Sequence, residues 1–206
     1  MAKPNRRVKR VLDLLVCTCA LPVALPLGGL IALLIRMDSK GAALYTQQRI
    51  GKNGKPFTLY KFRTMTQNAD AELEIYLKNN PALADEWKRT QKLQNDPRVT
   101  KIGHLLRKTS LDELPQLINV FKGEMSLVGP RPIVEDEIER YGKVFKEYCE
   151  MDPGLTGLWQ ISGRSDTTYA RRLACDHKYA NNWSLWLDIK ILAKTIPTAL
   201  KGFGAY

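Results

Sequence analysis

The chain has 206 residues, 44% of them hydrophobic, which fits one main domain with an appendage and makes bulk disorder an unsuitable description. Its net charge of +11 requires an anionic partner: nucleic acid, a phosphorylated substrate or acidic lipid. The four cysteines include no Cys-x-x-Cys pair and the two histidines are far apart in sequence. Neither a disulfide framework nor a zinc site is therefore expected.

The first feature along the chain is an uncharged apolar run over residues 14–35, long enough to span a bilayer. Pro22 and Pro26 lie inside it, and a proline removes a backbone hydrogen bond and clashes with the preceding turn, so we expect a bend there. Basic residues flank the run on both sides, namely Lys3, Arg6, Arg7, Lys9, Arg10, Arg36 and Lys40. Since positive flanks prefer the cytoplasmic side, residues 1–40 are predicted to form a basic arm and a re-entrant membrane helix.

An ordinary signal anchor with a tolerated kink is the alternative interpretation of this segment. A cleaved signal peptide is least favoured, because the run exceeds the usual apolar length of roughly 7–15 residues and no clear A-x-A site follows it. Under the re-entrant interpretation, residues 41–206 form one cytosolic domain.

This domain is predicted to be α+β and mostly helical, with a small β-hairpin. The hairpin consists of strands over 43–50 and 57–65 around the turn sequence GKNG at 51–54. A rigid loop, GPRP, is expected at 129–132. The predicted helices cover 69–93 with a break near 79–81, 100–108, 111–121, 133–150, 166–180 and 184–201.

The segment RKTSLDELP at 107–115 carries the most chemical information. Ser110 and Glu113 match the capping-box pattern, which is a purely structural interpretation, and Asp112 would then sit in the first turn of a helix. A helix N-terminus is also an anion site, and the upstream cations Arg107 and Lys108 would keep a nearby carboxylate ionised. An ionised carboxylate can attack a phosphate as a nucleophile when Mg²⁺ or arginines screen the charge. Spacing alone leaves both interpretations open.

Arginines elsewhere provide candidate phosphate ligands. Arg131 lies between Pro130 and Pro132, which restrict the backbone and limit the entropy lost when its guanidinium binds a phosphate. Arg63, in YKFRTM at 60–65, and Arg164, in SGRS at 162–165, are further candidates. Each of these two, taken alone, is also typical of a solvated surface charge.

Several segments, in their order along the chain, resemble the bacterial sugar transferase family, also called monotopic phosphoglycosyl transferases. The matching segments are KRVLD at 9–13, the proline-broken apolar run, YKFRTM at 60–65, TSLDELPQL at 109–117, MSLVGPRP at 125–132 and PGLTGLWQ at 153–160. Each is weak alone, whereas the ordered set is highly specific. NDPRVT at 95–100 and GAY at 204–206 make the catalytic domain of undecaprenyl-phosphate galactose phosphotransferases the nearest group. Larger members of that group carry further N-terminal membrane helices, so the chain is either a short form or an excised catalytic domain.

The resemblance implies a two-step reaction at the cytoplasmic face of the bacterial inner membrane. Asp112 would attack the β-phosphate of a UDP-sugar, releasing UMP and leaving a covalent phosphosugar that undecaprenyl phosphate then accepts. Glu113 would assist, with Mg²⁺ held by Asp112 and Glu113, while Arg107 and Arg131 would hold phosphates. The resemblance favours galactose as the sugar, with glucose second. Acidic membrane lipids are expected partners, and a homodimer remains open.

One departure from the family concerns the membrane helix, where a Ser-Pro pair is expected at the bend. Here Leu25 precedes Pro26, and Pro22 is additional, so the position of the bend is left open.

Rival functions have weaker support. A membrane-anchored nucleic-acid-binding protein would use the basic charge, but no recognisable motif is present and we expect no nucleic-acid partner. A non-catalytic scaffold of glycan assembly conflicts with the intact Asp112, Glu113 and Arg131. The sequence contains no D-x-D, Walker A or G-x-G-x-x-G pattern, which disfavours a sugar-only glycosyltransferase, a P-loop kinase and a dinucleotide fold.

Overall fold

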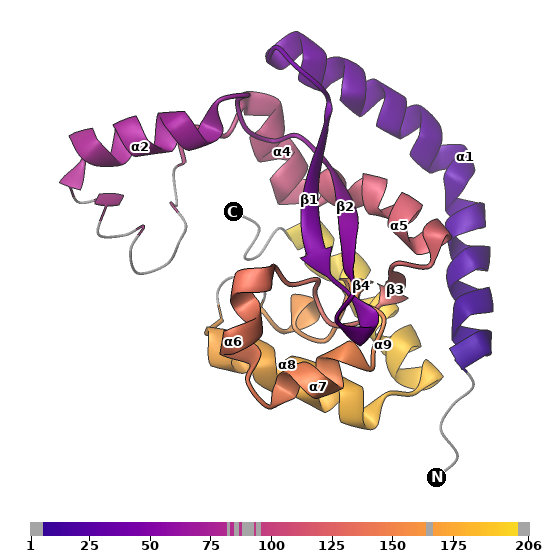
Figure 1. Cartoon of the computed structure of the whole chain (residues 1–206). Coiled ribbons are helices and arrows are strands. Elements are labelled where there is room, and N and C mark those ends of the chain that lie inside the picture. The colour runs from indigo at the N-terminus through magenta and orange to yellow at the C-terminus, as the bar shows by residue number, and fades with distance from the viewer. Residues whose placement is uncertain are drawn as a thin grey trace.

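A computed structural model describes residues 6–81, 83–84, 87, 93, 96–163 and 167–201. The described part is mostly helical and has only short strands, which confirms the predicted α+β class (Figure 1). The long helix α1 (Arg6–Asp38) lies along one side of the molecule, the hairpin of β1 (Leu44–Ile50) and β2 (Pro56–Phe62) runs through its middle, and α2 (Ala69–Asn79) projects away from the rest.

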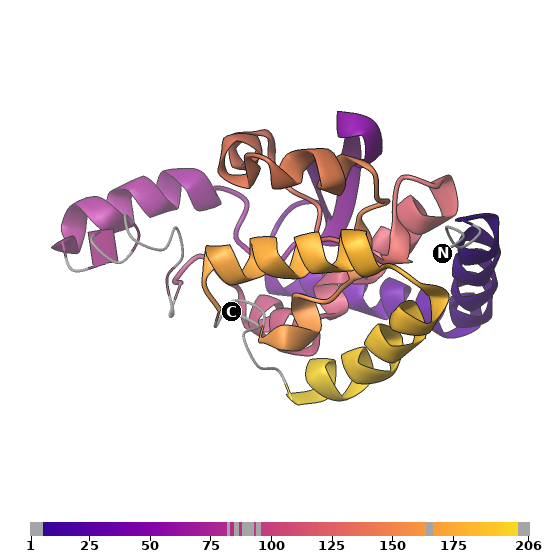
Figure 2. The same ribbon diagram turned by 90° about the horizontal axis from the view of Figure 1, so that it is seen from below.

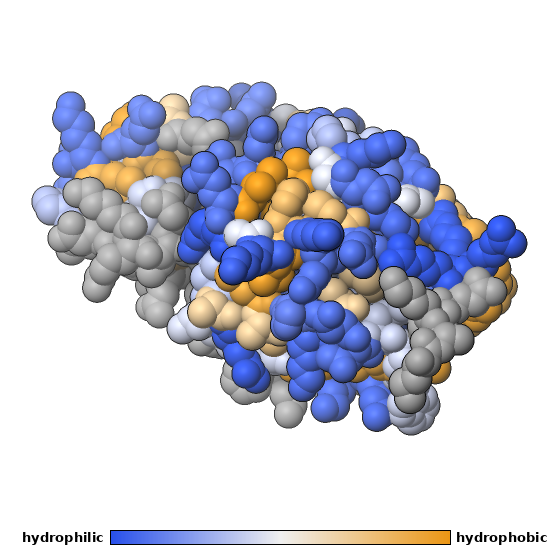
Figure 3. Space-filling model, turned by 60° about the horizontal axis from the view of Figure 1, so that its bottom comes forward, coloured by the Kyte–Doolittle hydropathy of each residue, from blue (hydrophilic) through white to orange (hydrophobic). Residues whose placement is uncertain are grey.

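Helix α1 continues through Pro22 and Pro26, and Figure 1 shows that it changes direction near its middle. By length and composition it can cross a membrane, and only 11% of its most apolar window is buried against the rest of the protein. Both halves nevertheless contact the same domain: Asp13 and Cys17 are buried in the first half, Ile31 and Ile35 in the second. Hydrophobic residues gather along the edge of the molecule formed by α1 (Figure 3).

The predicted hairpin is confirmed. Strand β1 (Leu44–Ile50) pairs with antiparallel β2 (Pro56–Phe62) around the short 3₁₀ turn η1 (Lys52–Gly54). In that turn Asn53 has a φ of 59°, a left-handed conformation that asparagine adopts more readily than most residues. The hairpin directs the side chain of Lys61 toward the segment that follows helix α4 (Lys101–Thr109).

A second pair of strands was missed by the sequence analysis. Strand β3 (Ser126–Val128) runs parallel to β4 (Gly154–Thr156). The two chains approach so closely that a Cβ atom on Gly154 would lie 2.0 Å from the amide nitrogen of Gly129. Glycine is required there because any side chain would collide with backbone that cannot move aside. The rigid loop over 129–132 therefore begins directly at the end of a fixed strand.

Two predicted helices differ from the structure. The segment 111–121 forms a 3₁₀ helix, η2 (Leu111–Gln116), followed by α5 (Leu117–Lys122), because Pro115 has no N–H to donate to an α-helical turn. The expected helix over 133–150 is broken. Gly142 separates α6 from α7 with a φ of 48°, and the pieces are η3 (Glu135–Glu137), α6 (Ile138–Tyr141) and α7 (Val144–Cys149).

The other predicted helices occur close to their expected positions. They are α2 (Ala69–Asn79), α4, α8 (Tyr169–Asn182) and α9 (Leu185–Lys201), with a short 3₁₀ turn η4 (Gln160–Ser162) before α8. Figure 2 shows α9 on the outside of the molecule, with its N-terminal end beside α1. The described part of the segment 69–93 is helical until Asn79, which agrees with the predicted break.

The hydrophobic core fixes the elements around the candidate site. One cluster joins Cys17 of α1 to Val120, Met125 and Ile191, which come from α5, the approach to β3, and α9. A second cluster joins Ile31, Ile35, Phe62 and Leu106, so the other half of α1 packs against β2 and α4. Because η2 lies between β2 and α4, both clusters hold the segment that carries Asp112 and Glu113.

Candidate active site

The candidate catalytic carboxylates lie at a sharp reversal of the chain. Helix α4 ends at Thr109, and Ser110 takes a left-handed conformation with a φ of 58°, an uncommon state for a residue with a side chain. The reversal starts η2 at once, so Asp112 and Glu113 occupy its first turn and lie against β2. Strain of this kind persists only where the surrounding packing holds it, and it is often found at functional sites.

Two cations meet the carboxylates. The ammonium of Lys61 donates a 2.8 Å hydrogen bond to Oε1 of Glu113 and lies 3.7 Å from Oδ2 of Asp112. The guanidinium of Arg131 donates to the same Glu113 oxygen at 3.3 Å. The side chains of Asp112 and Glu113 are 14% and 19% exposed, so the pair is largely desolvated yet still reachable from solvent.

The two neighbouring carboxyl groups differ in pKa: that of Asp112 is raised and that of Glu113 is lowered. Burial raises the pKa of Asp112, against the lowering effect of Lys61, and the neighbouring charge of Glu113 adds to the rise. Burial would also raise the pKa of Glu113, but the charges and hydrogen bonds of Lys61 and Arg131 outweigh it and lower that pKa to about 2. Glu113 therefore stays an anion at neutral pH. This favours a role in accepting hydrogen bonds from the two cations over a role in proton transfer. Asp112 carries the more basic carboxylate, and basicity favours nucleophilic attack.

The sequence analysis missed Lys61, although it lies inside the YKFRTM segment. Its neighbour Arg63 was chosen instead because guanidinium groups bind phosphate well. Along strand β2, Lys61 and Phe62 point to opposite faces, and only the packing of η2 against one face shows that Lys61 reaches the carboxylates. Lys61 is the first cation to include in the site.

Arg63 lies elsewhere in the structure. Its guanidinium donates to the backbone oxygen of Lys40 and, at 2.9 Å, to the backbone and side-chain oxygens of Ser39. These contacts hold the chain where it leaves α1, so Arg63 ties the end of α1 to the segment that directly follows β2. Its predicted role as a phosphate ligand has no support from its position.

Arg107 is closer to the site. It occupies the last turn of α4, and its Nε donates to Oγ1 of Thr64 at 3.0 Å. Its charge is one of those that lower the pKa of Asp112, although less strongly than Lys61 does. Arg107 therefore borders the carboxylate pair, where it can contribute charge to a bound phosphate.

The capping-box interpretation of Ser110 and Glu113 is wrong. The side chain of Ser110 makes no capping hydrogen bond, and the Glu113 carboxylate is occupied by Lys61 and Arg131. The anion site expected at a helix N-terminus stays a prediction: η2 is a six-residue 3₁₀ helix, so any dipole contribution there is that of a short helix. The positive charge beside the carboxylates comes from the side chains of Lys61 and Arg131.

The loop of Pro130, Arg131 and Pro132, predicted to be rigid, follows β3. Arg49 of the hairpin donates to the carbonyl of Pro132 at 3.3 Å and so holds the end of this loop. The Arg131 guanidinium also lies 5.8 Å from the ring centre of Trp159, a distance suited to a cation–π contact. Arg164 lies outside the described residues.

The family resemblance implies Mg²⁺, for which carboxylate oxygens are the expected protein ligands. Within the ranges that the structure describes, no three His, Cys, Asp or Glu residues are grouped to hold a metal. Mg²⁺ is commonly bound through one or two carboxylates, with water and substrate phosphates completing its shell. Asp112 and Glu113 fit that open type of site and do not form a closed protein cage.

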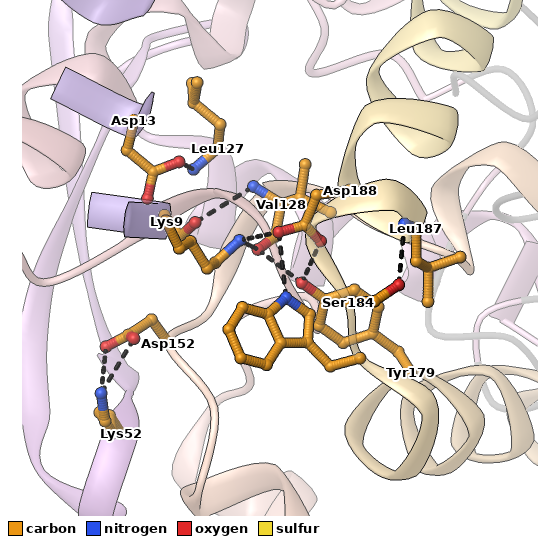
Figure 4. A network of polar contacts seen from close by, with 12 residues as sticks. Lys9, Asp13, Lys52, Leu127, Val128, Asp152, Tyr179, Ser184, Leu187 and Asp188 are labelled. Atoms are coloured by element: carbon orange, nitrogen blue, oxygen red, sulfur yellow. Dashed lines mark hydrogen bonds and ion pairs between the residues drawn. The ribbon is translucent and has the colours of Figure 1, made fainter. Parts of the chain in front are cut away.

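A buried polar network ties α1 to the strand that precedes the Arg131 loop (Figure 4). Lys9 donates to the carbonyl of Val128 at 2.9 Å and to Oδ2 of Asp188 at 2.6 Å. Asp13 accepts from the amide of Leu127 at 3.1 Å. Helix α1 thereby holds β3, which also pairs with β4 and ends three residues before Arg131.

These features define a class of protein: an enzyme that can associate with a membrane through α1 and gathers carboxylates and cations for chemistry at phosphate. The family model described as "Bacterial sugar transferase" matches residues 4–202. The chain belongs to the bacterial sugar transferase family, and this confirms the resemblance found in its motifs.

Curated relatives are similar over almost the whole chain. Exopolysaccharide production protein ExoY of Sinorhizobium fredii is 51% identical over 96% of this chain and 88% of the relative. Undecaprenyl-phosphate galactose phosphotransferase of Salmonella typhimurium is 48% identical over 99% of this chain but 43% of its own length. UDP-glucose:undecaprenyl-phosphate glucose-1-phosphate transferase of Escherichia coli is 40% identical over 97% of this chain and 41% of its own length. The chain thus spans under half of the two longer relatives.

Proposed function

We propose that this enzyme transfers a hexose 1-phosphate from a UDP-sugar to undecaprenyl phosphate, with release of UMP, through a covalent intermediate on Asp112. The observation that carries the proposal is the meeting of Asp112 and Glu113 with Lys61 and Arg131 in one partly exposed cluster. Membership of a sugar transferase family and the names of the relatives, which include galactose and glucose phosphate transferases, support the same reaction.

In the first step an Asp112 oxygen attacks the β-phosphorus of the UDP-sugar. The bond from that phosphorus to the bridging oxygen breaks, and UMP leaves with the electron pair. In the second step a phosphate oxygen of undecaprenyl phosphate attacks the same phosphorus, and the Asp112 carboxylate leaves. The product is an undecaprenyl diphosphate sugar, and the enzyme returns to its starting state.

The cations solve the problem that both reactants are negative. Lys61 and Arg131 place positive charge beside the carboxylates before substrate arrives, so no reorganisation is needed as charge develops. Glu113 holds both cations through one oxygen and stays ionised because its pKa is about 2. Bound Mg²⁺ supplies further screening of the diphosphate.

The location proposed is the cytoplasmic face of the bacterial inner membrane. Both halves of α1 pack on the same domain, which a helix crossing the bilayer to its far side would not allow. The bend visible in Figure 1 and the basic flanks support a re-entrant helix with both ends on one side. The active site would then meet a soluble nucleotide sugar and a lipid headgroup from the same position.

The test uses purified protein in lipid nanodiscs with Mg²⁺, undecaprenyl phosphate and a panel of UDP-sugars, with UMP release as readout. UDP-galactose is the expected donor and UDP-glucose the second choice. Without acceptor, the intact protein should gain the mass of one hexose phosphate, and Asp112→Asn should gain none. Asp136→Asn, which removes an exposed carboxylate, is the matched control.

Two results would contradict the proposal. Covalent labelling of the Asp112→Asn protein would remove Asp112 from the mechanism. Folded wild-type protein that releases no UMP with any donor would favour the alternative of a non-catalytic scaffold of glycan assembly.

A further inference from the structure

The guanidinium of Arg131 is held only loosely by its carboxylate partner. It donates to one oxygen of Glu113 at 3.3 Å, and the Arg131 side chain is 29% exposed. A charged hydrogen bond of this kind is usually shorter, at about 2.7–2.9 Å. A long side chain with one weak contact samples several rotamers, and fixing it on a substrate costs free energy. A fixed geometry at a bound phosphate therefore requires other groups that restrict the Arg131 guanidinium.

The ring of Trp159 contacts two guanidinium groups. Its centre lies 5.8 Å from Cζ of Arg131 and 5.3 Å from Cζ of Arg172. The indole N–H donates to Oγ1 of Thr167 at 2.9 Å, which fixes the orientation of the ring. Attraction between a guanidinium and an aromatic face is stronger where water is excluded, and Trp159 is half-buried. The ring therefore links a cation of the candidate active site to a cation in the interior.

The interior cation, Arg172, is only 8% exposed. Its Nη1 donates to Oε1 of Glu137 at 2.8 Å, while Nε and Nη2 are buried without a hydrogen-bond partner in the described part of the chain. Its Cζ also lies 5.8 Å and 5.5 Å from the ring centres of Tyr141 and Tyr169. Burying unpaired N–H groups costs stability, which aromatic rings offset only in part. Such a residue is better explained by what it positions than by what it stabilises.

Glu137 joins Arg172 to the other side of the Arg131 loop. It pairs with Arg172 at 2.8 Å and lies 3.9 Å from Nη1 of Arg49. Arg49 in turn donates to the carbonyl of Pro132, the residue after Arg131. The contacts close on themselves in the order Arg131, Trp159, Arg172, Glu137, Arg49 and Pro132. Arg131 is therefore restrained twice, next to its backbone by Arg49 and at its guanidinium by the indole ring.

We propose that Trp159 and Arg172 are positioning residues for Arg131. Trp159 keeps the Arg131 guanidinium directed at the carboxylates, and Arg172, anchored by Glu137, keeps Trp159 in place. The inference rests on the proposed function, in which Arg131 contacts the phosphate being transferred. Neither Trp159 nor Arg172 contacts the substrate, so the loss of activity on replacing either one arises through Arg131.

A double-mutant cycle tests whether the two residues act through Arg131. Trp159→Leu and Arg172→Met are made in the wild type and in the Arg131→Gln protein, and kcat and KM for UMP release are measured in nanodiscs. In the wild type each should lower kcat about tenfold, with a smaller change in the KM for the UDP-sugar, because a displaced cation stabilises the transition state less. In the Arg131→Gln protein neither should cause a further loss.

Two further variants separate positioning from a loss of folding. Trp159→Phe keeps an aromatic face and should retain more of the wild-type kcat than Trp159→Leu. Arg171→Met replaces an exposed arginine next to Arg172 on the same helix and should leave kcat unchanged. Thermal unfolding is measured for every variant, and rates are compared at a temperature where all of them are folded.

Equal losses in the two backgrounds would overturn the inference, because they would show effects that do not pass through Arg131. A higher KM for Trp159→Leu in both backgrounds would overturn it in favour of direct contact between the ring and the nucleotide. In either case, wild-type protein that gains the mass of one hexose phosphate leaves the proposed function intact. Absence of that mass gain in folded wild-type protein would contradict the proposed function, and the inference with it.

Discussion

The cluster around Lys9 and Asp188 and the cluster around Lys61 and Asp112 differ in how completely the aspartate carboxylate is paired. In the α1–α9 network, the side chains of Lys9 and Asp188 are 8% and 9% exposed. Both Asp188 oxygens accept: one from Tyr179 at 2.7 Å, the other from Lys9 and from Trp183 at 3.0 Å. A buried charge with every partner in place stabilises one arrangement of the helices.

The candidate active site is less complete. Asp112 lies 3.7 Å from Lys61, which is longer than a hydrogen bond, while Glu113 takes the shorter contacts to Lys61 and Arg131. Desolvation and the neighbouring charge of Glu113 raise the pKa of the largely desolvated Asp112, although cations lie around it. The comparison teaches that full pairing marks a structural cluster, whereas a desolvated and incompletely paired carboxylate is prepared for chemistry.

The largest expected effects, on activity in one cluster and on stability in the other, come from replacing the aspartate of each cluster by asparagine. Asp112→Asn should lower UMP release by on the order of 10⁴-fold or more, because it removes the nucleophile. It should leave the thermal midpoint unchanged or higher, because a neutral amide is cheaper to bury. Asp188→Asn should lower the midpoint clearly, because it leaves Lys9 buried without its counter-ion. Rate measurements and thermal unfolding in the same nanodiscs compare them, and equal destabilisation by both would contradict the distinction.

A smaller loss of activity is expected when Arg131, in the loop over 129–132, is replaced. Arg131→Gln should lower kcat/KM by about 10²–10³-fold, because a positioned charge on the transferring phosphate is lost. Arg131→Lys should recover part of this, since it keeps the charge but not the planar fork. The exposed Arg171→Gln is the control, and steady-state kinetics is the measurement. Unchanged kinetics in Arg131→Gln would limit Arg131 to holding Glu113.

The third prediction concerns removal of the lysine charge from the cluster of Lys9 and Asp188. Lys9→Met should destabilise the folded protein by about 3–5 kcal/mol, because Asp188 is left as an uncompensated buried charge. The double variant Lys9→Met/Asp188→Asn should be more stable than the single variant, since the unpaired charge is gone. Denaturant unfolding checks this, with exposed Lys190→Met as control. Additive losses in the double variant would show that the two residues are not coupled.

The sequence was most informative where the pattern is local. Gly51 and Gly54 border a turn between two short strands, so the hairpin was predicted, and helices were predicted close to α4, α8 and α9. It was least informative where a few residues depend on distant contacts. Strands β3 and β4 are too short to show alternation, and only the close approach of Gly129 to Gly154 fixes them.

The sequence predicted only part of the candidate site, because some of its residues depend on distant contacts. Asp112, Glu113 and Arg131 stand in recognisable motifs, and the structure brings all three together. Lys61 belongs to the cluster only because β2 packs against η2, and no spacing in the sequence indicates that contact. The left-handed turn at Ser110 was hidden by the capping-box pattern, which predicts a different conformation from the same residues.

The finest test of the comparison is the pH dependence of UMP release. The Asp112 carboxylate must be ionised to attack, so activity is lost as pH falls through its pKa, which burial places above the usual value. Lys61 is the strongest influence lowering that pKa, and Glu113 raises it. Lys61→Met should therefore move the acid limb of the profile to higher pH, whereas Glu113→Gln, measured on its residual rate, should move it to lower pH.

Opposite shifts from two substitutions in one cluster distinguish Asp112 from the substrate as the titrating group. Ionisation of the substrate phosphate would place the acid limb at the same pH in both variants. Lys122→Met, which removes an exposed lysine beside Tyr60, is the matched control and should leave the limb unmoved. Shifts of the same sign in both variants would mean that the limb does not report the Asp112 carboxylate, and the contrast between the two clusters would lose its chemical basis.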